Sequence, residues 1–263
     1  MCLYPVQIPN PAFKNDVFAP AMITVSCGKC TECLRSQSQV WAVRVMLEAR
    51  QYEENCFITL TYNNKYVPQD GQLNRRHIQL FVKSLRKAIA PRKIRIFYSG
   101  EYGAQKRRPH FHLVVFNWQP PDLVPFVDNK RDSFFTSSFV SKLWKRGFIS
   151  VGKLEFNSAL YCAKYMQKIA SQDMEIPSFV GMSNRPGIGY SAVTDKMLSG
   201  VLYYDGKSMP LPRYFVKVLE QQGFDVSELK LKRSEYRQLS ERLGDNLDIE
   251  RRRKKSDEFL QKP

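Results

Sequence analysis

Two strand-like segments joined by a polar turn are the feature that most constrains the fold of this chain. Residues 94–100 and 112–116 are rich in β-branched and aromatic residues, and residues 103–108 between them are mostly polar. This pattern predicts an antiparallel hairpin buried in a hydrophobic core. Because successive side chains of a strand point to opposite faces, Phe111 should point into the core while its two neighbours face the other way.

Those two neighbours, His110 and His112, are two of only three histidines in the chain. Glu101, near the end of the first strand, can reach across the hairpin to them. Two imidazoles and one carboxylate make a metal site with open coordination positions, of the kind that supports catalysis. In the alternative interpretation the histidines face solvent, and Glu101 pairs with a basic residue of the turn: Lys106, Arg107 or Arg108.

A second group of reactive side chains lies on a helix predicted from residue 158 to about residue 170. Tyr161, Lys164, Tyr165 and Lys168 follow the spacing i, i+3, i+4 and i+7, which places all four on one helical face. The other side is small and apolar and suits packing on a sheet. A phenol with its ordinary pKa of about 10 is a poor nucleophile at neutral pH, but a nearby ammonium group or a metal-polarised phosphate makes attack easier. The alternative is an aromatic pair flanked by solvated lysines.

The positive charge of the chain is concentrated in the segment that carries these residues. The formal net charge is +16, and residues 56–170 alone hold 20 Lys and Arg against 6 Asp and Glu, a net charge of +14. A basic excess interleaved with aromatic residues is typical of nucleic-acid-binding proteins, and a solvated basic face is the alternative. No apolar run approaches about 18 residues, so we expect no membrane span.

Four cysteines near the N-terminus predict a further metal site. Cys27, Cys30 and Cys33 have the spacing CxxCxxC, and Cys2 could supply a fourth thiolate. Four thiolates would make a closed, structural zinc site. The alternative is a set of reduced cysteines at the start of a helix. The chain begins without the pattern of a signal peptide, so its six cysteines point to a reducing compartment.

Composition divides the chain into four segments. Residues 1–55 form a Cys-rich segment with an irregular start and then a helix, and residues 56–170 form the core. Residues 171–224 are rich in proline and predict a loop-rich extension. Residues 225–263 predict a charged helical tail, whose basic run at 251–255 either is solvated or contacts DNA.

The core predicts an α+β fold. Its expected elements are a strand at 56–62, a helix at 75–90, the hairpin, a helix at 134–146, a strand at 148–151 and the tyrosine helix. Asn74 is the expected N-cap of the first helix, Gly147 a candidate C-cap of the second, and His77 an exposed polar residue. This order fits an antiparallel sheet with helices on one face, as in ferredoxin-like folds.

The His-hydrophobic-His strand, the preceding carboxylate and the YxxKYxxK helix together resemble rolling-circle replication initiators of the HUH endonuclease superfamily. The two tyrosines separated by three residues are similar to the two-tyrosine class of single-stranded DNA microviruses. Other stretches resemble the replication initiators of gokushovirus-type microviruses: residues 1–5, 27–30 with Trp41 beyond them, 57–62, 99–103 and 185–189. The resemblance covers roughly residues 1–190.

This resemblance implies a mechanism. His110, His112 and Glu101 would bind Mg²⁺ or Mn²⁺, and the metal would polarise the scissile phosphate of single-stranded origin DNA. Tyr161 or Tyr165 would attack that phosphate, leaving a free 3′-OH and a 5′-phosphotyrosine link. The link conserves the bond energy, so the second tyrosine can later cleave and rejoin the strand.

The resemblance also implies the remaining roles and the partners. Lys164 and Lys168 would steady phosphate charge or position the tyrosines. The partners would be single-stranded or supercoiled viral origin DNA, a host helicase and host replication proteins, in the cytoplasm of the host cell. Two other classes of function stay open: a non-catalytic, zinc-containing single-stranded-DNA-binding protein, and a metal-dependent hydrolase without a covalent intermediate.

Overall fold

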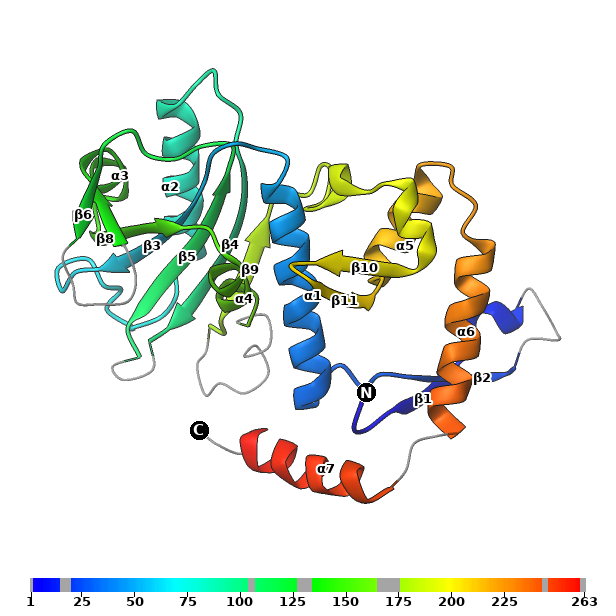
Figure 1. Ribbon diagram of the computed structural model, residues 1–263. Helices are drawn as coiled ribbons and strands as arrows, with labels where there is room; N and C mark the ends of the chain where they lie inside the picture. Colours follow the sequence, from blue (N-terminus) through cyan, green and yellow to red (C-terminus); the bar gives the residue numbers. More distant parts are fainter. Residues whose placement is uncertain are drawn as a thin grey trace. The chain divides into compact units, whose positions relative to one another are not determined.

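The computed structural model describes residues 2–14, 20–103, 107–126, 134–164, 176–242 and 246–260 (Figure 1). The chain divides into two compact units. The smaller comprises residues 1–38 and 230–263, and the larger comprises residues 39–229. None of the described helices is both long and apolar enough to cross a membrane.

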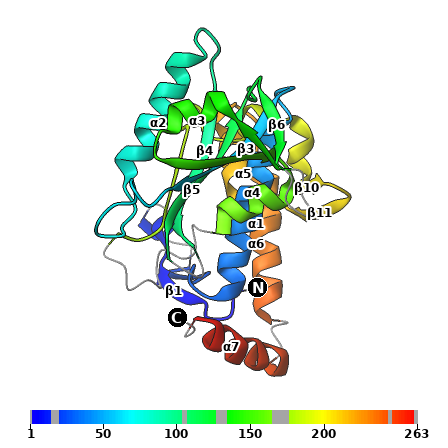
Figure 2. The same cartoon turned by 90° about the vertical axis from the view of Figure 1, so that its left-hand side faces the viewer.

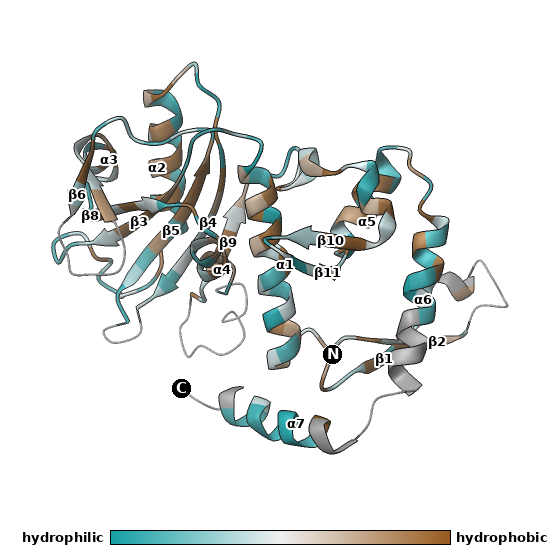
Figure 3. Ribbon diagram, in the orientation of Figure 1, coloured by the Kyte–Doolittle hydropathy of each residue, from teal (hydrophilic) through white to brown (hydrophobic). Residues whose placement is uncertain are grey.

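A seven-stranded antiparallel sheet forms the centre of the larger unit, with the strand order β6-β7-β8-β3-β5-β4-β9. Hydrophobic residues fill the middle of β4 and β5 (Figure 3). The hairpin predicted from the sequence is confirmed as the β4–β5 pair, in which Glu101 lies directly opposite His110. The seven strands are β3 (Asn55–Tyr62), β4 (Arg95–Tyr102), β5 (Pro109–Phe116), β6 (Leu123–Phe126), β7 (Phe134–Ser137), β8 (Gly147–Lys153) and β9 (Phe179–Met182).

Helices cover both faces of this sheet. Helices α2 (Arg75–Ala88) and α3 (Ser138–Trp144) pack on one face, and α4 (Phe156–Lys164) packs on the other together with the second half of α1 (Thr31–Ala49) (Figure 2). The α+β class is confirmed, but the expectation of helices on one face was wrong. The interior strand β5 is buried almost throughout, so side chains on both of its faces must be covered by other elements.

The region expected to be a helix over 134–146 begins as a strand. Phe134–Ser137 pairs with β6, and its Phe and Thr residues favour a strand. Ser137 then accepts a hydrogen bond from the Val140 N–H and caps α3. Lys145, rather than Gly147, takes the left-handed conformation at the end of α3. Gly147 instead begins β8, where any Cβ would clash with the backbone of β3.

The extension after residue 170 holds more regular structure than expected. Strand β9 joins the sheet beside β4, and β10 (Val201–Tyr204) pairs with β11 (Lys207–Pro210). Two short 3-10 helices, η3 (Tyr190–Ala192) and η4 (Asp195–Ser199), precede this hairpin, and α5 (Arg213–Gln221) follows it.

Charged residues of α1 and β4 hold the turn at residues 185–189. Glu48 is buried, forms an ion pair with Arg95 at 2.5 Å and accepts the Gly189 N–H at 2.7 Å. Arg44 donates twice to the Ile188 carbonyl, and its guanidinium lies between the rings of Trp41 and Tyr214. These contacts give the turn a structural role.

The smaller unit contains the chain termini. Residues 1–26, expected to be irregular, include a hairpin of β1 (Val6–Pro9) and β2 (Met22–Val25), with the 3-10 helix η1 (Pro11–Lys14) between them. The expected helical tail is confirmed as α6 (Ser227–Arg242) and α7 (Asn246–Leu260). The first residues of α6 belong to the larger unit.

Candidate functional site

Glu101, His110 and His112 meet on the face of the sheet that α4 covers. Nε2 of each histidine lies 2.6 Å from Oε1 of Glu101, and the three ligand atoms lie within 4.8 Å of one another. Glu101 is 1% exposed, and its second oxygen, Oε2, is buried without a hydrogen-bond partner among the described residues. A buried carboxylate oxygen is costly without a ligand. The donor set therefore fits a divalent cation with open coordination positions.

The other ring nitrogens fix the orientation of both histidines. Nδ1 of His110 lies 3.0 Å from the Arg108 carbonyl, which can only accept, so Nδ1 donates and Nε2 faces Glu101. Nδ1 of His112 lies 3.0 Å from the hydroxyl of Thr59, its direct neighbour on β3. Partners of this kind orient metal-binding imidazoles and set their tautomer. Sequence reasoning missed Thr59, since its role depends on the β3–β5 register.

The protonation states of Glu101 and His112 suit metal binding. Burial alone would raise the pKa of Glu101, but the hydrogen bonds from His110 and His112 outweigh it and hold the pKa below its usual range. Burial lowers the pKa of His112, and Glu101 offsets this only in part. An ionised carboxylate beside a neutral imidazole is the state in which both bind a metal ion. Burial alone would lower the pKa of His110, but the hydrogen bond and charge of Glu101 outweigh it and raise that pKa, so a metal ion must displace the proton on its Nε2.

The alternative partners proposed for Glu101 in the turn receive no support from the described residues. Arg108 donates to the Tyr62 carbonyl and to the Asn64 side chain, 2.8 and 2.6 Å away. Lys106 lies outside the described residues. Glu101 is thus bound by the histidines and by a tyrosine.

Small side chains on α4 bring that tyrosine to Glu101, His110 and His112. Ala159, Cys162 and Ala163 are fully buried against the sheet, which confirms the predicted apolar side of the helix. The hydroxyl of Tyr161 donates to Oε1 of Glu101 at 3.1 Å, and its ring meets the His112 ring edge-on at 4.9 Å between centroids. Tyr161 is also 40% exposed, so its phenol borders both solvent and the cluster.

The environment of Tyr161 keeps its phenol protonated. Burial and the charge of Glu101 raise the pKa of Tyr161 well above its usual range. Lys164 is exposed at the last residue of α4. Tyr165 and Lys168, the other two members of the predicted face, lie outside the described residues.

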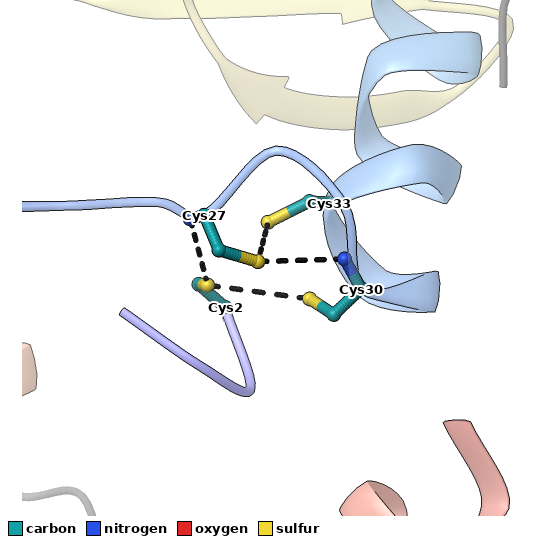
Figure 4. Close-up of side chains that lie close together, drawn as sticks. All are labelled: Cys2, Cys27, Cys30 and Cys33. Carbon is teal, nitrogen blue, oxygen red and sulfur yellow. Dashed lines mark hydrogen bonds between the residues drawn. The ribbon is translucent and has the colours of Figure 1, made fainter. Parts of the chain in front are cut away.

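The four N-terminal cysteines also come together, in the smaller unit (Figure 4). The sulfur atoms of Cys2 and Cys30 are 4.0 Å apart, those of Cys27 and Cys33 are 3.9 Å apart, and all four lie within 4.8 Å. None of them is in a disulfide. Zn–S bonds of about 2.3 Å in a tetrahedron require sulfur–sulfur distances of about 3.8 Å. The cluster therefore fits zinc.

Backbone N–H groups stabilise the thiolate of Cys27, whereas burial raises the pKa of Cys2 and of Cys33. The Cys27 N–H donates to the sulfur of Cys2 at 3.2 Å, and the Cys30 N–H donates to the sulfur of Cys27 at 3.4 Å. Burial alone would raise the pKa of Cys27, but the backbone N–H groups of Cys30 and Lys29 outweigh it and lower the pKa to about 6. A thiolate is the form of cysteine that binds a metal.

Helix α7 is bonded to the segment that carries the cysteines. Ser256, which is buried, accepts the Thr31 N–H at 3.3 Å, and Arg253 donates to the Leu3 carbonyl at 2.8 Å. Tyr4 donates to the carboxylate of Asp257. These hydrogen bonds connect α7 to the N-terminal residues that lie next to the cysteine cluster.

We expect loss of the cysteine cluster to destabilise the protein. Cys30→Ser removes a buried ligand, and a structural zinc site contributing about 3 kcal/mol would make the Tm fall by about 6–12 °C. A chelator should lower the Tm of the wild type in the same way but leave the variant unchanged. Zinc-free purified protein, together with a variant that melts like the wild type, would contradict the assignment.

His77 differs from its expected state. It is half-buried in the first turn of α2, and its Nδ1 lies 2.8 Å from the hydroxyl of the buried Tyr62. The expectation of an exposed residue was wrong because the long side chain of Tyr62 extends from β3 and contacts the His77 ring. Asn74 is confirmed as the N-cap of α2, accepting the Arg76 N–H.

Comparison with known proteins shows that this chain is similar to replication-associated proteins. A family model for replication-associated proteins of the ORF2 type matches residues 55–170. Replication-associated protein ORF2 of Spiroplasma virus 4 is 32% identical over 222 residues, which cover 77% of this chain and 69% of that protein. Replication-associated protein VP4 of Bdellovibrio phage phiMH2K is 28% identical over 238 residues, covering 81% of this chain and 75% of that protein.

Replication-associated protein ORF4 of Chlamydia phage 1 is also 32% identical, over 220 residues. The aligned residues cover 77% of this chain but 55% of that protein, so this chain spans about half of its length. No solved structure matches this chain significantly.

Proposed function

Because this chain belongs to the family of phage replication-associated proteins, we propose that it initiates rolling-circle replication. It nicks and rejoins single-stranded origin DNA through a tyrosine, with a divalent cation as cofactor. The contact of the Tyr161 hydroxyl with Glu101, beside His110 and His112, carries the proposal. A nucleophile and the ligands of a phosphate-binding cation then lie within one hydrogen bond of each other.

The residues of the cluster have two different roles, metal binding and nucleophilic attack. Glu101, His110 and His112 would hold Mg²⁺ or Mn²⁺, and such an ion would supply Lewis-acid polarisation of the scissile phosphate. The phenolic oxygen of Tyr161 loses its proton and bonds to phosphorus, while the bond from phosphorus to the 3′ oxygen breaks and that oxygen gains a proton. The product strands are a free 3′-OH and a 5′-phosphotyrosine link, in which the energy of the broken bond is kept.

The YxxKYxxK pattern supplies the second half of the cycle. Tyr165 cleaves or rejoins the strand when Tyr161 already carries DNA. Lys164 and Lys168 neutralise phosphate charge close to the tyrosines. Residues 56–170 act as the nuclease core, residues 1–55 with their zinc-binding cysteines and residues 225–263 act as flanking segments, and residues 171–224 extend the core.

The partners follow from the same proposal. The substrate is the viral origin, single-stranded or exposed by supercoiling, in the cytoplasm of the host cell. A host helicase unwinds the duplex ahead of the new strand, and host replication proteins complete its synthesis.

Incubation with end-labelled single-stranded origin DNA tests this function. In Mn²⁺ or Mg²⁺ the wild type should give one discrete cleavage product on a denaturing gel, together with a band retained by the protein. Addition of a chelator should abolish both. Binding without cleavage at any metal concentration would instead support the non-catalytic single-stranded-DNA-binding alternative.

A further inference from the structure

The exposed side of α2 carries positive charge that no acidic residue of the helix balances. Its exposed basic residues are Arg75, Arg76, Lys83, Arg86 and Lys87, and the helix contains neither Asp nor Glu. Across the described part of the chain, none of the five forms an ion pair. Uncompensated cations along one surface attract a polyanion.

One flank of α2 combines this charge with an open cavity. Gln79, Lys83 and Arg86 line a cavity of about 340 Å³ together with apolar and aromatic side chains of the helix and the sheet: Val82, Ile96, Tyr98 and Met182. Arg75 lies on the same flank, with its guanidinium carbon 4.3 Å from the centre of the Phe179 ring. Basic side chains and apolar or aromatic side chains therefore line the same cavity.

The aromatic wall of this cavity is held in place. Tyr98 on β4 lies opposite Gly181 on β9, and a Cβ at Gly181 would clash with the Tyr98 ring, so the ring rests on the β9 backbone. The Phe179 ring meets it edge-on, with 6.5 Å between centroids. A rigid ring next to cations is the arrangement on which single-stranded nucleic-acid bases stack.

This cavity lies on the opposite face of the sheet from the metal ligands. Side chains alternate along β4, so Ile96 and Tyr98 face α2 while Glu101 faces α4. A nucleotide bound there is outside the catalytic cluster.

We propose that the α2 seam, defined as Arg75, Lys83, Arg86 and Tyr98, binds a second stretch of single-stranded DNA. This inference rests on the proposed function for the identity of the substrate. Phosphates lie on Lys83 and Arg86, which are one helical turn apart, and on Arg75 further along the flank, while an unpaired base stacks on Tyr98. A duplex keeps its bases stacked and cannot fill the cavity. The seam therefore binds one stretch of the strand while the scissile phosphate is cleaved at the catalytic cluster.

Removing the three cations of the seam tests its phosphate contacts. In Arg75→Gln/Lys83→Gln/Arg86→Gln, the slope of log affinity against log salt for an oligothymidylate of about 20 nucleotides should flatten by about 2, since each single-strand phosphate contact contributes about 0.7. Lys196→Gln/Lys207→Gln/Lys217→Gln removes the same charge from exposed positions elsewhere in the larger unit. An equal change in both triple variants would overturn the proposal.

The base contact has its own test. Tyr98→Leu should weaken binding of the oligothymidylate at least about fivefold, whereas Tyr98→Phe should bind like the wild type. An abasic strand with the same phosphates should bind all three proteins equally, and a loss of abasic-strand affinity in Tyr98→Leu as large as its loss for the oligothymidylate would contradict the stacking contact. Wild-type affinity of Tyr98→Leu for the oligothymidylate contradicts the proposal. A duplex of equal length that binds as tightly as the single strand contradicts it too.

These assays measure binding without cleavage, so the two proposals can fail separately. A wild type that forms no covalent adduct, while the seam variants lose affinity, would contradict the proposed function and leave the seam supported. A wild type that forms the adduct, with seam variants of normal affinity and salt slope, would contradict the seam alone.

Discussion

His112→Ala should lower the rate of metal-dependent DNA cleavage by at least about 100-fold. The substitution removes one of the three proposed metal ligands and the ring that contacts Tyr161. DNA affinity should stay within about threefold of the wild type, because it comes from many phosphate contacts rather than from one ion. Cleavage on denaturing gels and binding by fluorescence anisotropy measure the two effects in the same preparation.

The chain offers two matched controls for this variant. His77→Gln changes the third histidine, outside the cluster, and should keep wild-type cleavage. Thr59→Val removes only the hydroxyl 3.0 Å from Nδ1 of His112, so it should raise the metal concentration needed for half-maximal cleavage by about 10–100-fold and recover activity in excess Mn²⁺. Wild-type cleavage by His112→Ala in Mn²⁺ would refute the metal assignment.

The double variant Tyr161→Phe/Tyr165→Phe should form no covalent DNA adduct, a loss of at least about 1,000-fold, while still binding DNA. Phenylalanine keeps the ring and removes only the nucleophilic oxygen. Each single variant should retain some adduct, since residues four apart on a helix have Cβ atoms about 6 Å apart and can approach one phosphate. Tyr161→Phe should be the more damaging, because its hydroxyl reaches Glu101.

Denaturing electrophoresis of the protein after incubation with labelled origin DNA measures these adducts. The readout separates three outcomes. Adduct in the double variant would remove both tyrosines from the reaction. One single variant that is fully inactive, beside one with normal adduct, would make the protein a one-tyrosine nickase. Unequal but non-zero adduct in both is the result that alternating tyrosines require.

The proximity of Glu101, His110 and His112 could be predicted because it depends on local rules. Alternation along one strand places His110 and His112 together, and a short turn fixes the pairing of Glu101 with His110. The cysteine cluster also follows from spacing, except for Cys2, whose approach depends on the path of a distant segment. Short-range periodicity likewise predicted the buried side of α4.

The remaining features depend on long-range contacts that periodicity does not report. Strand β9 belongs to a proline-rich extension, and only its pairing with β4 gives it a strand conformation. Thr59 reaches His112 through the register between β3 and β5. The seam on α2 needs a helix and two strands from three parts of the sequence. The charge that marks it was visible in the sequence, but the cavity was not.

Identification of the residue that becomes linked to DNA is the direct test of cleavage by a tyrosine. Wild-type protein is incubated with origin DNA and Mn²⁺, the adduct is digested with protease and nuclease, and the peptides are analysed by mass spectrometry. We expect a peptide in which Tyr161 or Tyr165 bears a 5′-phosphonucleotide. Cleaved DNA with free 5′-phosphate ends and no modified tyrosine would contradict it, and would identify a metal-dependent hydrolase instead.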